Sequence, residues 1–251
     1  MRIRQSYLGT ADDCLRKLQY QIESPIRLSG AVRAVGTGYH AGLAYLYSER
    51  MKGMVKATPE ELILVGQEAF DVELKGAGES FIWDKANFPT RRAAHEGIDF
   101  LLTTFEEGGY EWPADWQVLG VELDLRMEWQ GHERTAQPDL VMLDPNGWVV
   151  IEDHKTAGKR WNQGKEHPRK NNQAPWYVPM VESIFPGANG YRFVFGIMTY
   201  KGVFERRITG EPRAILGPCP RVVTRIDGSV RARATPRGRT RGAPPGTRAR
   251  P

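Results

Sequence analysis

The sequence is poor in cysteine and contains no long apolar run. Of its 251 residues only Cys14 and Cys219 are cysteines, and they lie far apart. Two cysteines exclude a disulfide-stapled secreted scaffold and any four-cysteine metal or iron–sulfur site supplied by this chain alone. No apolar stretch approaches the roughly 18 residues that a membrane-spanning helix needs. The first residues lack the apolar core of a signal peptide, so we expect a soluble cytoplasmic protein without a membrane partner.

Positive charge is unevenly distributed along the chain. The net charge is +5, but residues 218–251 contain nine arginines and one acid, Asp227, which gives this segment a charge of +8. Residues 1–217 therefore carry a charge of −3. The segment 218–251 is also rich in proline and poor in apolar residues, and such a composition cannot offset the entropy of ordering. We therefore predict one domain over residues 1–217 and a disordered basic tail over residues 218–251.

The spacing of apolar residues predicts helices in the first half of the chain. Residues 58–61 (TPEE) have the form of a capping box with proline at the first helical position, so a helix should begin there. Predicted helices cover residues 11–22, 37–52, 58–74 and 90–107.

The period then changes to that of strands. From residue 121 to residue 129 apolar and charged side chains alternate, which is typical of a half-buried strand. A second strand ending near residue 143 and a third over 148–153 would complete an antiparallel meander, with the turn DPNG between them. A helix over 172–185 and an apolar strand over 191–200 should follow. This order predicts an α/β fold.

Two acidic residues and a lysine should converge at the end of the third strand of this meander. Side chains alternate between the faces of a strand, so Asp153 and Lys155 face one way, and Glu152 and His154 the other. Asp139 lies on the preceding strand. Two carboxylates beside an ammonium group suit Mg²⁺ or Mn²⁺, and a metal-bound water is a nucleophile at neutral pH. A salt bridge at a strand end is the simpler explanation of an Asp-x-Lys pair, so the assignment depends on context.

Four short segments supply that context. Residues 36–40 (GTGYH) place glycines before a histidine in an early helix, and residues 138–139 (PD) contain the first acid. Residues 153–156 (DHKT) contain the second acid with its lysine, and residues 173–177 (QAPWY) pair a glutamine with a tyrosine. In this order, over residues 36–177, they resemble the motifs of the PD-(D/E)XK nuclease superfamily, and within it the RecB-type exonuclease branch. The resemblance implies a restriction-endonuclease-like fold, with a central mixed sheet of four or five strands flanked by helices.

The resemblance also implies a metal-dependent site. His40, Asp139, Asp153 and the backbone carbonyl of His154 would hold Mg²⁺ or Mn²⁺. Lys155 would orient the attacking water or stabilise the developing charge. Taken alone, His40 is more typical of a packed, hydrogen-bonded histidine, and only the motifs downstream favour a ligand.

The helix that follows would contribute to DNA binding. Gln173 and Tyr177 lie one helical turn apart and would line the DNA channel. Pro179 lies inside the same helix and should kink or end it. Trp161 and Trp176 flank the site, where either core packing or base stacking fits them. Glu122 corresponds loosely to a strand carboxylate of some relatives.

The function predicted from these residues is hydrolysis of DNA phosphodiester bonds. We favour an exonuclease of recombination or repair that acts on linear duplex or single-stranded ends, of the stand-alone type that bacteriophages encode, with a recombination protein as a candidate partner. Some relatives of the CRISPR-adaptation type carry four cysteines, which Cys14 and Cys219 cannot supply, so no iron–sulfur cluster is expected. The alternative is a catalytically inactive nucleic-acid-binding module of the same fold, and the presence of both acids and the lysine argues against it.

Overall fold

The structure is a computed structural model. It describes residues 2–4, 7, 10–11, 14–23, 29–53, 56–158 and 173–209. The predicted basic tail over 218–251 and the end of the predicted domain at 217 lie outside these residues, as does Trp161. Within the described ranges, every helix is too short or too polar to cross a bilayer.

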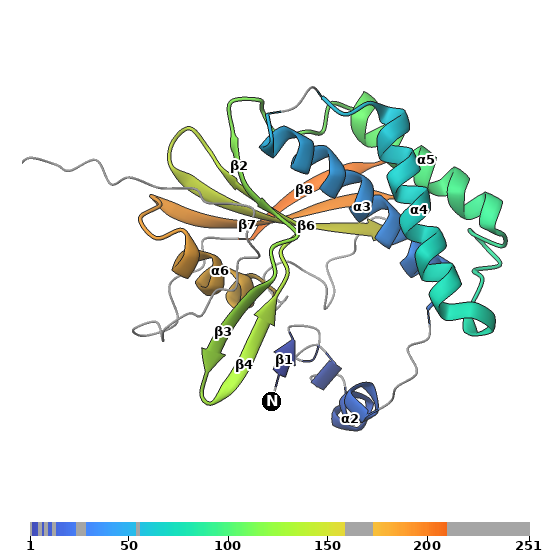
Figure 1. Ribbon diagram of the computed structural model, residues 1–251, viewed down its shortest axis with the longest axis horizontal. Helices are drawn as coiled ribbons and strands as arrows, with labels where there is room; N and C mark the ends of the chain where they lie inside the picture. The colour runs from blue at the N-terminus through green and yellow to red at the C-terminus, as the bar shows by residue number, and fades with distance from the viewer. Residues whose placement is uncertain are drawn as a thin grey trace, which may run out of the picture.

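The centre of the molecule is a five-stranded mixed sheet with the order β2-β5-β6-β7-β8 (Figure 1). Its strands are β2 (Gln117–Val121), β5 (Leu140–Leu143), β6 (Trp148–Ala157), β7 (Gly190–Thr199) and β8 (Phe204–Thr209). β6 runs parallel to β7, and the other neighbours are antiparallel. This arrangement confirms the predicted central mixed sheet, although β8 was not predicted.

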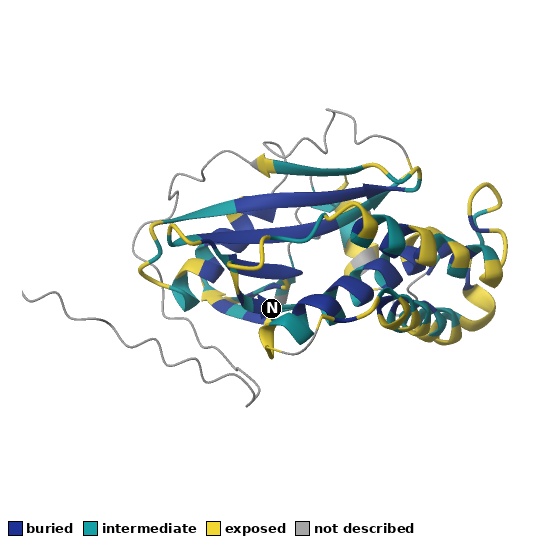
Figure 2. Ribbon diagram, turned by 90° about the horizontal axis from the view of Figure 1, so that it is seen from above, coloured by how far each residue is buried: buried dark blue, intermediate teal, exposed yellow. Residues whose placement is uncertain are grey.

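Helices cover both faces of this sheet, and successive side chains of its strands point alternately into the two hydrophobic cores beneath them. The longer helices are α3 (Ala31–Met51), α4 (Pro59–Ala77), α5 (Arg91–Glu107) and α6 (Gln173–Ile184). Leu140 and Met142 of β5 belong to the core beneath α3, α4 and α5, whereas Val141 belongs to the core beneath α6. The central strands are consequently buried along most of their length (Figure 2).

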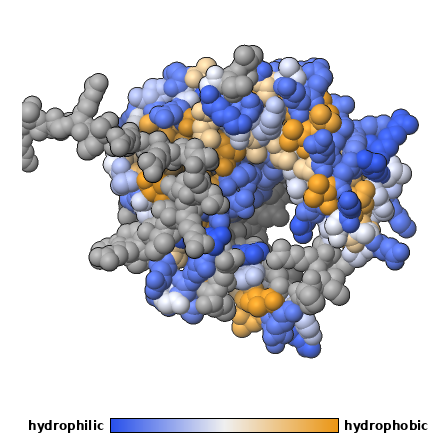
Figure 3. Space-filling view, in the orientation of Figure 1, coloured by the Kyte–Doolittle hydropathy of each residue, from blue (hydrophilic) through white to orange (hydrophobic). Residues whose placement is uncertain are grey.

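The predicted start of α4 is confirmed in its hydrogen bonds. The Thr58 hydroxyl accepts from the backbone N–H of Glu61, and the Glu61 carboxylate accepts from the backbone N–H of Thr58. Two shorter elements precede α3, the strand β1 (Arg2–Arg4) and the helix α2 (Leu15–Glu23), and a 3₁₀ turn (Gly78–Ser80) follows α4. On the face seen in Figure 1, the surface is hollowed beside α3 and α4, and hydrophilic residues border much of the hollow (Figure 3).

The predicted single strand over 121–129 is wrong. The chain leaves the large sheet after Val121 and continues as β3 (Leu125–Trp129), which pairs with β4 (His132–Ala136) in a second sheet of order β1-β4-β3. The predicted strand that ends near residue 143 is likewise divided, into β4 and β5. Glu122 marks the break with a φ of 49°, a left-handed conformation that interrupts a strand without altering the alternation of side chains around it.

Helices α3 and α4 cross closely because both present glycine at the contact. A Cβ added at Gly38 would lie 2.6 Å from the carbonyl oxygen of Gly66, and a Cβ added at Gly66 would lie 2.8 Å from that of Gly38. Neither position can accept a side chain unless the helices move apart. Gly76, near the end of α4, would place a Cβ in open space.

These two glycines of α4 give a matched pair for stability. We expect Gly66→Ala to lower the free energy of unfolding by about 1–3 kcal/mol, because it overpacks the α3–α4 contact. Gly76→Ala should raise that free energy by roughly 0.5–1 kcal/mol, because alanine restricts the unfolded chain and fits the helix. Urea unfolding of both variants measures the difference, and equal changes would contradict the close crossing.

Candidate active site

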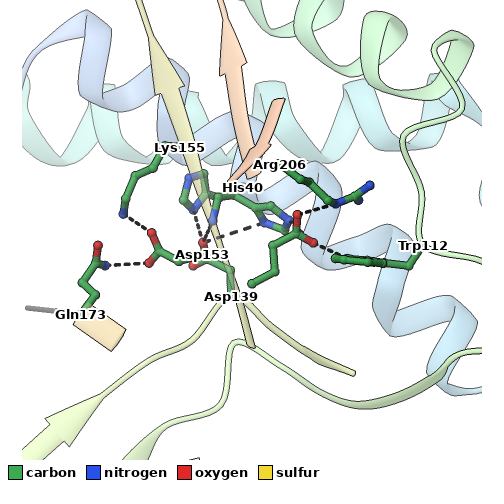
Figure 4. Close-up of polar contacts among 9 residues, drawn as sticks. His40, Trp112, Asp139, Asp153, Lys155, Gln173 and Arg206 are labelled. Atoms are coloured by element: carbon green, nitrogen blue, oxygen red, sulfur yellow. Dashed lines mark hydrogen bonds and ion pairs between the residues drawn. The ribbon is translucent and has the colours of Figure 1, made fainter. Parts of the chain in front are cut away.

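Four side chains from three parts of the chain meet at one edge of the large sheet (Figure 4). His40 comes from the middle of α3, Asp139 immediately precedes β5, and Asp153 and Lys155 belong to β6. The β5–β6 register brings Asp139 beside Asp153, because Leu140 pairs with Glu152.

Gly36 allows α3 to lie close enough to β6 for His40 to reach Asp139. A Cβ added at Gly36 would lie 3.0 Å from the hydroxyl of Thr156, which is tighter than ordinary contact. The helix therefore lies directly against β6 one turn before His40. This is a physical reason for glycine in the segment 36–40.

The Asp139 carboxylate is stabilised as an anion. Its Oδ2 lies 3.4 Å from Nδ1 of His40 and accepts the backbone N–H of His154 at 2.5 Å. Burial by itself would raise the pKa of Asp139, but His40, His154 and Lys155 outweigh it and hold that pKa well below its usual range. In return, Asp139 raises the pKa of His40 against the opposing effect of burial. His40 is thus directed at a carboxylate, a contact that fits both the packed, hydrogen-bonded histidine and the metal ligand considered from the sequence.

Glu122 joins His40 and Asp139 in a group of three metal-binding side chains. One ligand atom of each lies within 4.8 Å of the others, and within the described ranges this is the one such group of three. The backbone N–H of Glu122 donates to the carbonyl of Asp139 at 3.0 Å, so the strand break itself brings the two acids together. Burial, and then the nearby Asp139 carboxylate, raise the pKa of Glu122 to about 7.

The donor chemistry of this group fits a hard divalent cation. Two carboxylates supply the oxygen ligands that Mg²⁺ and Mn²⁺ prefer, and Mn²⁺ also accepts an imidazole nitrogen. Burial is the main cause of the raised pKa of Glu122 and the Asp139 carboxylate adds to it, and a cation between the two carboxylates would favour their charged forms. His40, Glu122 and Asp139 are therefore the residues that could hold a metal.

Both oxygens of the second acid, Asp153, are engaged. The Lys155 ammonium contacts Oδ2, and the Gln173 amide donates to Oδ1 at 2.8 Å. Burial raises the pKa of Asp153, although Lys155 acts in the opposite direction. Asp153 is thus held in one orientation on the same face of β6 as Lys155.

The predicted DNA-binding pair lies deeper than expected. Gln173 is 6% exposed and Tyr177 7%, and Gln173 points at Asp153 and not away from the protein. Trp176 belongs to the hydrophobic core beneath α6. Of the two alternatives for this residue, core packing and base stacking, the structure therefore shows core packing. The His154 ring lies on the opposite face of β6, with Nε2 at 3.6 Å from Glu152 and Nδ1 at 3.8 Å from Asp139.

A second buried charged group on β6, the Glu152 carboxylate, was not among the predicted site residues. Glu152 is fully buried and accepts from Nε of Arg206 at 2.9 Å and from the indole N–H of Trp112. The Arg206 guanidinium also stacks on Trp112, 4.1 Å from the ring centroid. Gly196 on β7 leaves room for this carboxylate, because a Cβ there would lie 2.5 Å from it. Arg206 and Trp112 are remote from Glu152 in the sequence, and no local pattern signals the contact.

A substitution at Glu122 tests whether this group binds a metal. We expect Glu122→Gln to weaken Mn²⁺ binding by roughly tenfold or more, because a neutral amide replaces a charged ligand. Thermal stability in EDTA should not fall, since the change also removes repulsion with Asp139. Titration calorimetry with Mn²⁺ measures the affinity. Asp124→Asn is the matched control, because that side chain lies 59% exposed beside Arg126, and equal affinities of the two variants would contradict the site.

Comparison with known proteins assigns the family. A model of the PD-(D/E)XK nuclease superfamily matches residues 4–215. No curated protein matches the sequence. Among solved structures, the chain is similar to a candidate exonuclease from Eubacterium rectale, with 11% identity, a TM-score of 0.48, and coverage of 83% of this chain and 71% of that chain.

It is also similar to a protein named SSO0001, with 12% identity, a TM-score of 0.31, and coverage of 82% of this chain and 79% of that chain. Both likenesses are too distant to bear on function. The family match, in contrast, extends over most of the chain and includes all the residues of the site. The chain therefore belongs to the PD-(D/E)XK nuclease superfamily, whose members are metal-using hydrolases of nucleic acids.

Proposed function

We propose that the protein is a Mg²⁺- or Mn²⁺-dependent DNA nuclease of the RecB-type branch, acting as an exonuclease. The observation that carries the proposal is the position of Asp139. On one side it shares a group of possible metal ligands with His40 and Glu122. On the other it adjoins Asp153 and Lys155, so a metal group and an ammonium group would flank one phosphodiester.

In this proposal each residue has a separate task. His40, Glu122 and Asp139 would hold the cation, with Asp153 and the His154 carbonyl as further ligands. When bound, such a cation stabilises charge on a phosphate and lowers the pKa of water. Lys155 would orient the attacking water or stabilise the developing negative charge from the face it shares with Asp153.

The choice of DNA ends as substrate is supported by the order of the four motifs over residues 36–177, which is that of the exonuclease branch. Recombination or repair, a recombination protein as partner, a bacteriophage source and a cytoplasmic location belong to the same proposal, by analogy with that branch. Gln173 would contribute through Asp153, which it contacts, and Tyr177 would support the same turn.

An inactive nucleic-acid-binding module is the second candidate, and the burial of the site disfavours it. Asp139 and Asp153 are 9% and 3% exposed, and Lys155 is held against Asp153. Burying several ionised groups together is unfavourable unless each is compensated. A binding surface for phosphates requires exposed cations and gains nothing from such a cluster.

Cleavage of end-labelled DNA with added metal tests the proposal. We expect degradation of linear DNA in Mg²⁺ or Mn²⁺, with closed circular DNA left intact. Asp139→Ala, Asp153→Ala and Lys155→Ala should each lower the rate at least about 10³-fold, because the first two remove ligands of the cation and the third removes the ammonium group. DNA binding in Ca²⁺ should persist, and Asp124→Asn should cleave normally.

The outcomes separate the candidates. Cleavage of circular DNA would identify an endonuclease and contradict the exonuclease assignment. Binding without cleavage in any metal would identify the inactive module. Full activity of Asp153→Ala would contradict the proposed site.

We also propose that the basic segment 218–251 binds DNA through phosphate contacts. A charge of +8 attracts DNA of any sequence through its phosphates. Such contacts release counterions, so their contribution to DNA affinity falls steeply as the salt concentration rises. Ending the chain after Leu216 should weaken DNA affinity at low salt and flatten its salt dependence, while the melting temperature and the cleavage step stay unchanged. Affinity measured against salt in Ca²⁺ for both chains decides this, and overlapping curves would refute the role.

A further inference from the structure

Helix α6 continues through a proline. Residue i of an α-helix donates its N–H to the carbonyl of residue i−4, and proline has no N–H. Pro179 lies inside α6, so the carbonyl of Pro175 lacks its usual helical partner. Pro175 itself lies in the first turn, where a missing N–H leaves no bond unmade. The sequence predicts a kink or an end at Pro179, yet the helix runs on to Ile184.

A buried arginine from the second sheet replaces the missing donor. Nη2 of Arg134, on β4, donates to the carbonyl of Pro175 at 3.0 Å and to that of Trp176 at 2.6 Å. Arg134 is only 4% exposed, so these bonds form largely away from competing water. The first of them goes to the carbonyl that Pro179 leaves without a helical bond.

Trp176 of α6 in turn contacts β4. The Arg134 guanidinium lies 3.8 Å from the centroid of the Trp176 ring, and the indole N–H of Trp176 donates to the carbonyl of Thr135 at 2.9 Å. Hydrogen bonds donated by Arg134 to α6, a hydrogen bond donated by Trp176 to β4 and one cation–π contact therefore join β4 to a single turn of α6. Lysine could supply the charge, but it lacks the planar group that stacks on the ring while donating to two carbonyls.

This turn of α6 carries the contact with the candidate active site. Gln173 stands two residues before Pro175 and donates to Asp153 at 2.8 Å. A shift of the turn would move the amide away from that carboxylate. We propose that Arg134 is a positioning residue, which fixes the first turn of α6 by bonding the carbonyl that Pro179 frees and so keeps Gln173 on Asp153. The inference rests on the proposed function only in treating Asp153 as part of the reacting site.

A double-mutant cycle in stability tests the first half of the inference. Arg134→Met should lower the midpoint of urea unfolding, and Pro179→Ala restores a backbone N–H to α6. The loss caused by Arg134→Met should therefore be markedly smaller in the Pro179→Ala background. Arg126→Met is the control, because this more exposed arginine of the same hairpin pairs with Asp124 and should behave alike in both backgrounds. Equal losses for Arg134→Met in both backgrounds would overturn the role assigned to the freed carbonyl.

Structure and kinetics test the second half. In a crystal structure of Arg134→Met, the Gln173 amide should lie beyond hydrogen-bonding distance of Asp153. On linear DNA, kcat should fall roughly tenfold or more with KM little changed, and Arg134→Lys should recover part of the loss. In the Gln173→Ala background Arg134→Met should cause no further fall in kcat, although its effect on stability should persist, which a purely structural role would not predict.

The two proposals fail in different ways. A wild-type protein that cleaves no DNA contradicts the proposed function, while the crystal structure and the stability cycle still decide the role of Arg134. An unchanged Gln173–Asp153 bond in Arg134→Met, or a further fall in kcat without Gln173, would overturn the positioning role even if the nuclease is active.

Discussion

The carboxylate of Asp139 lies where α3, β5 and β6 meet, and groups of α3 and β6 stabilise its charge. The backbone N–H of His154 and the ring of His40 approach the same oxygen. The carbonyl of Asp139 accepts from Glu122 at the strand break. A buried anion is tolerated only when its charge is compensated, so the position of α3 and the β5–β6 register depend on each other at this carboxylate.

Strand β6 shows how one element supports charged groups on both faces. Asp153 is held between Lys155 and Gln173 on one face, while Glu152 is held by Arg206 and Trp112 on the other. The second set lies on the opposite face of β6 from the first and helps to hold the strand that carries both. Support also comes from outside the sheet, because α6 takes its orientation from Arg134 in the smaller sheet.

Local chemistry allowed much of the fold to be predicted. The capping box of α4 and the apolar spacing of α5 depend only on neighbouring residues, and both elements begin where those residues indicate. The wrong prediction of a single strand over 121–129 has one cause. The alternation over 121–129 continues through the break at Glu122, because a left-handed residue changes the path of the backbone without changing which positions are apolar. No count of periodicity can therefore show that the chain passes from one sheet to another.

The types of the site residues, their order along the chain and the face of β6 that carries Asp153 and Lys155 follow from the amino-acid sequence, because they depend on composition and on a period of two. Which groups come together depends on the tertiary structure. It joined Glu122 to His40 and Asp139, turned Gln173 towards Asp153, and placed Arg134 beside the carbonyl that Pro179 frees. Those distances depend on a strand break, a helix crossing and a contact between two sheets, and each arises between residues that the local sequence does not connect.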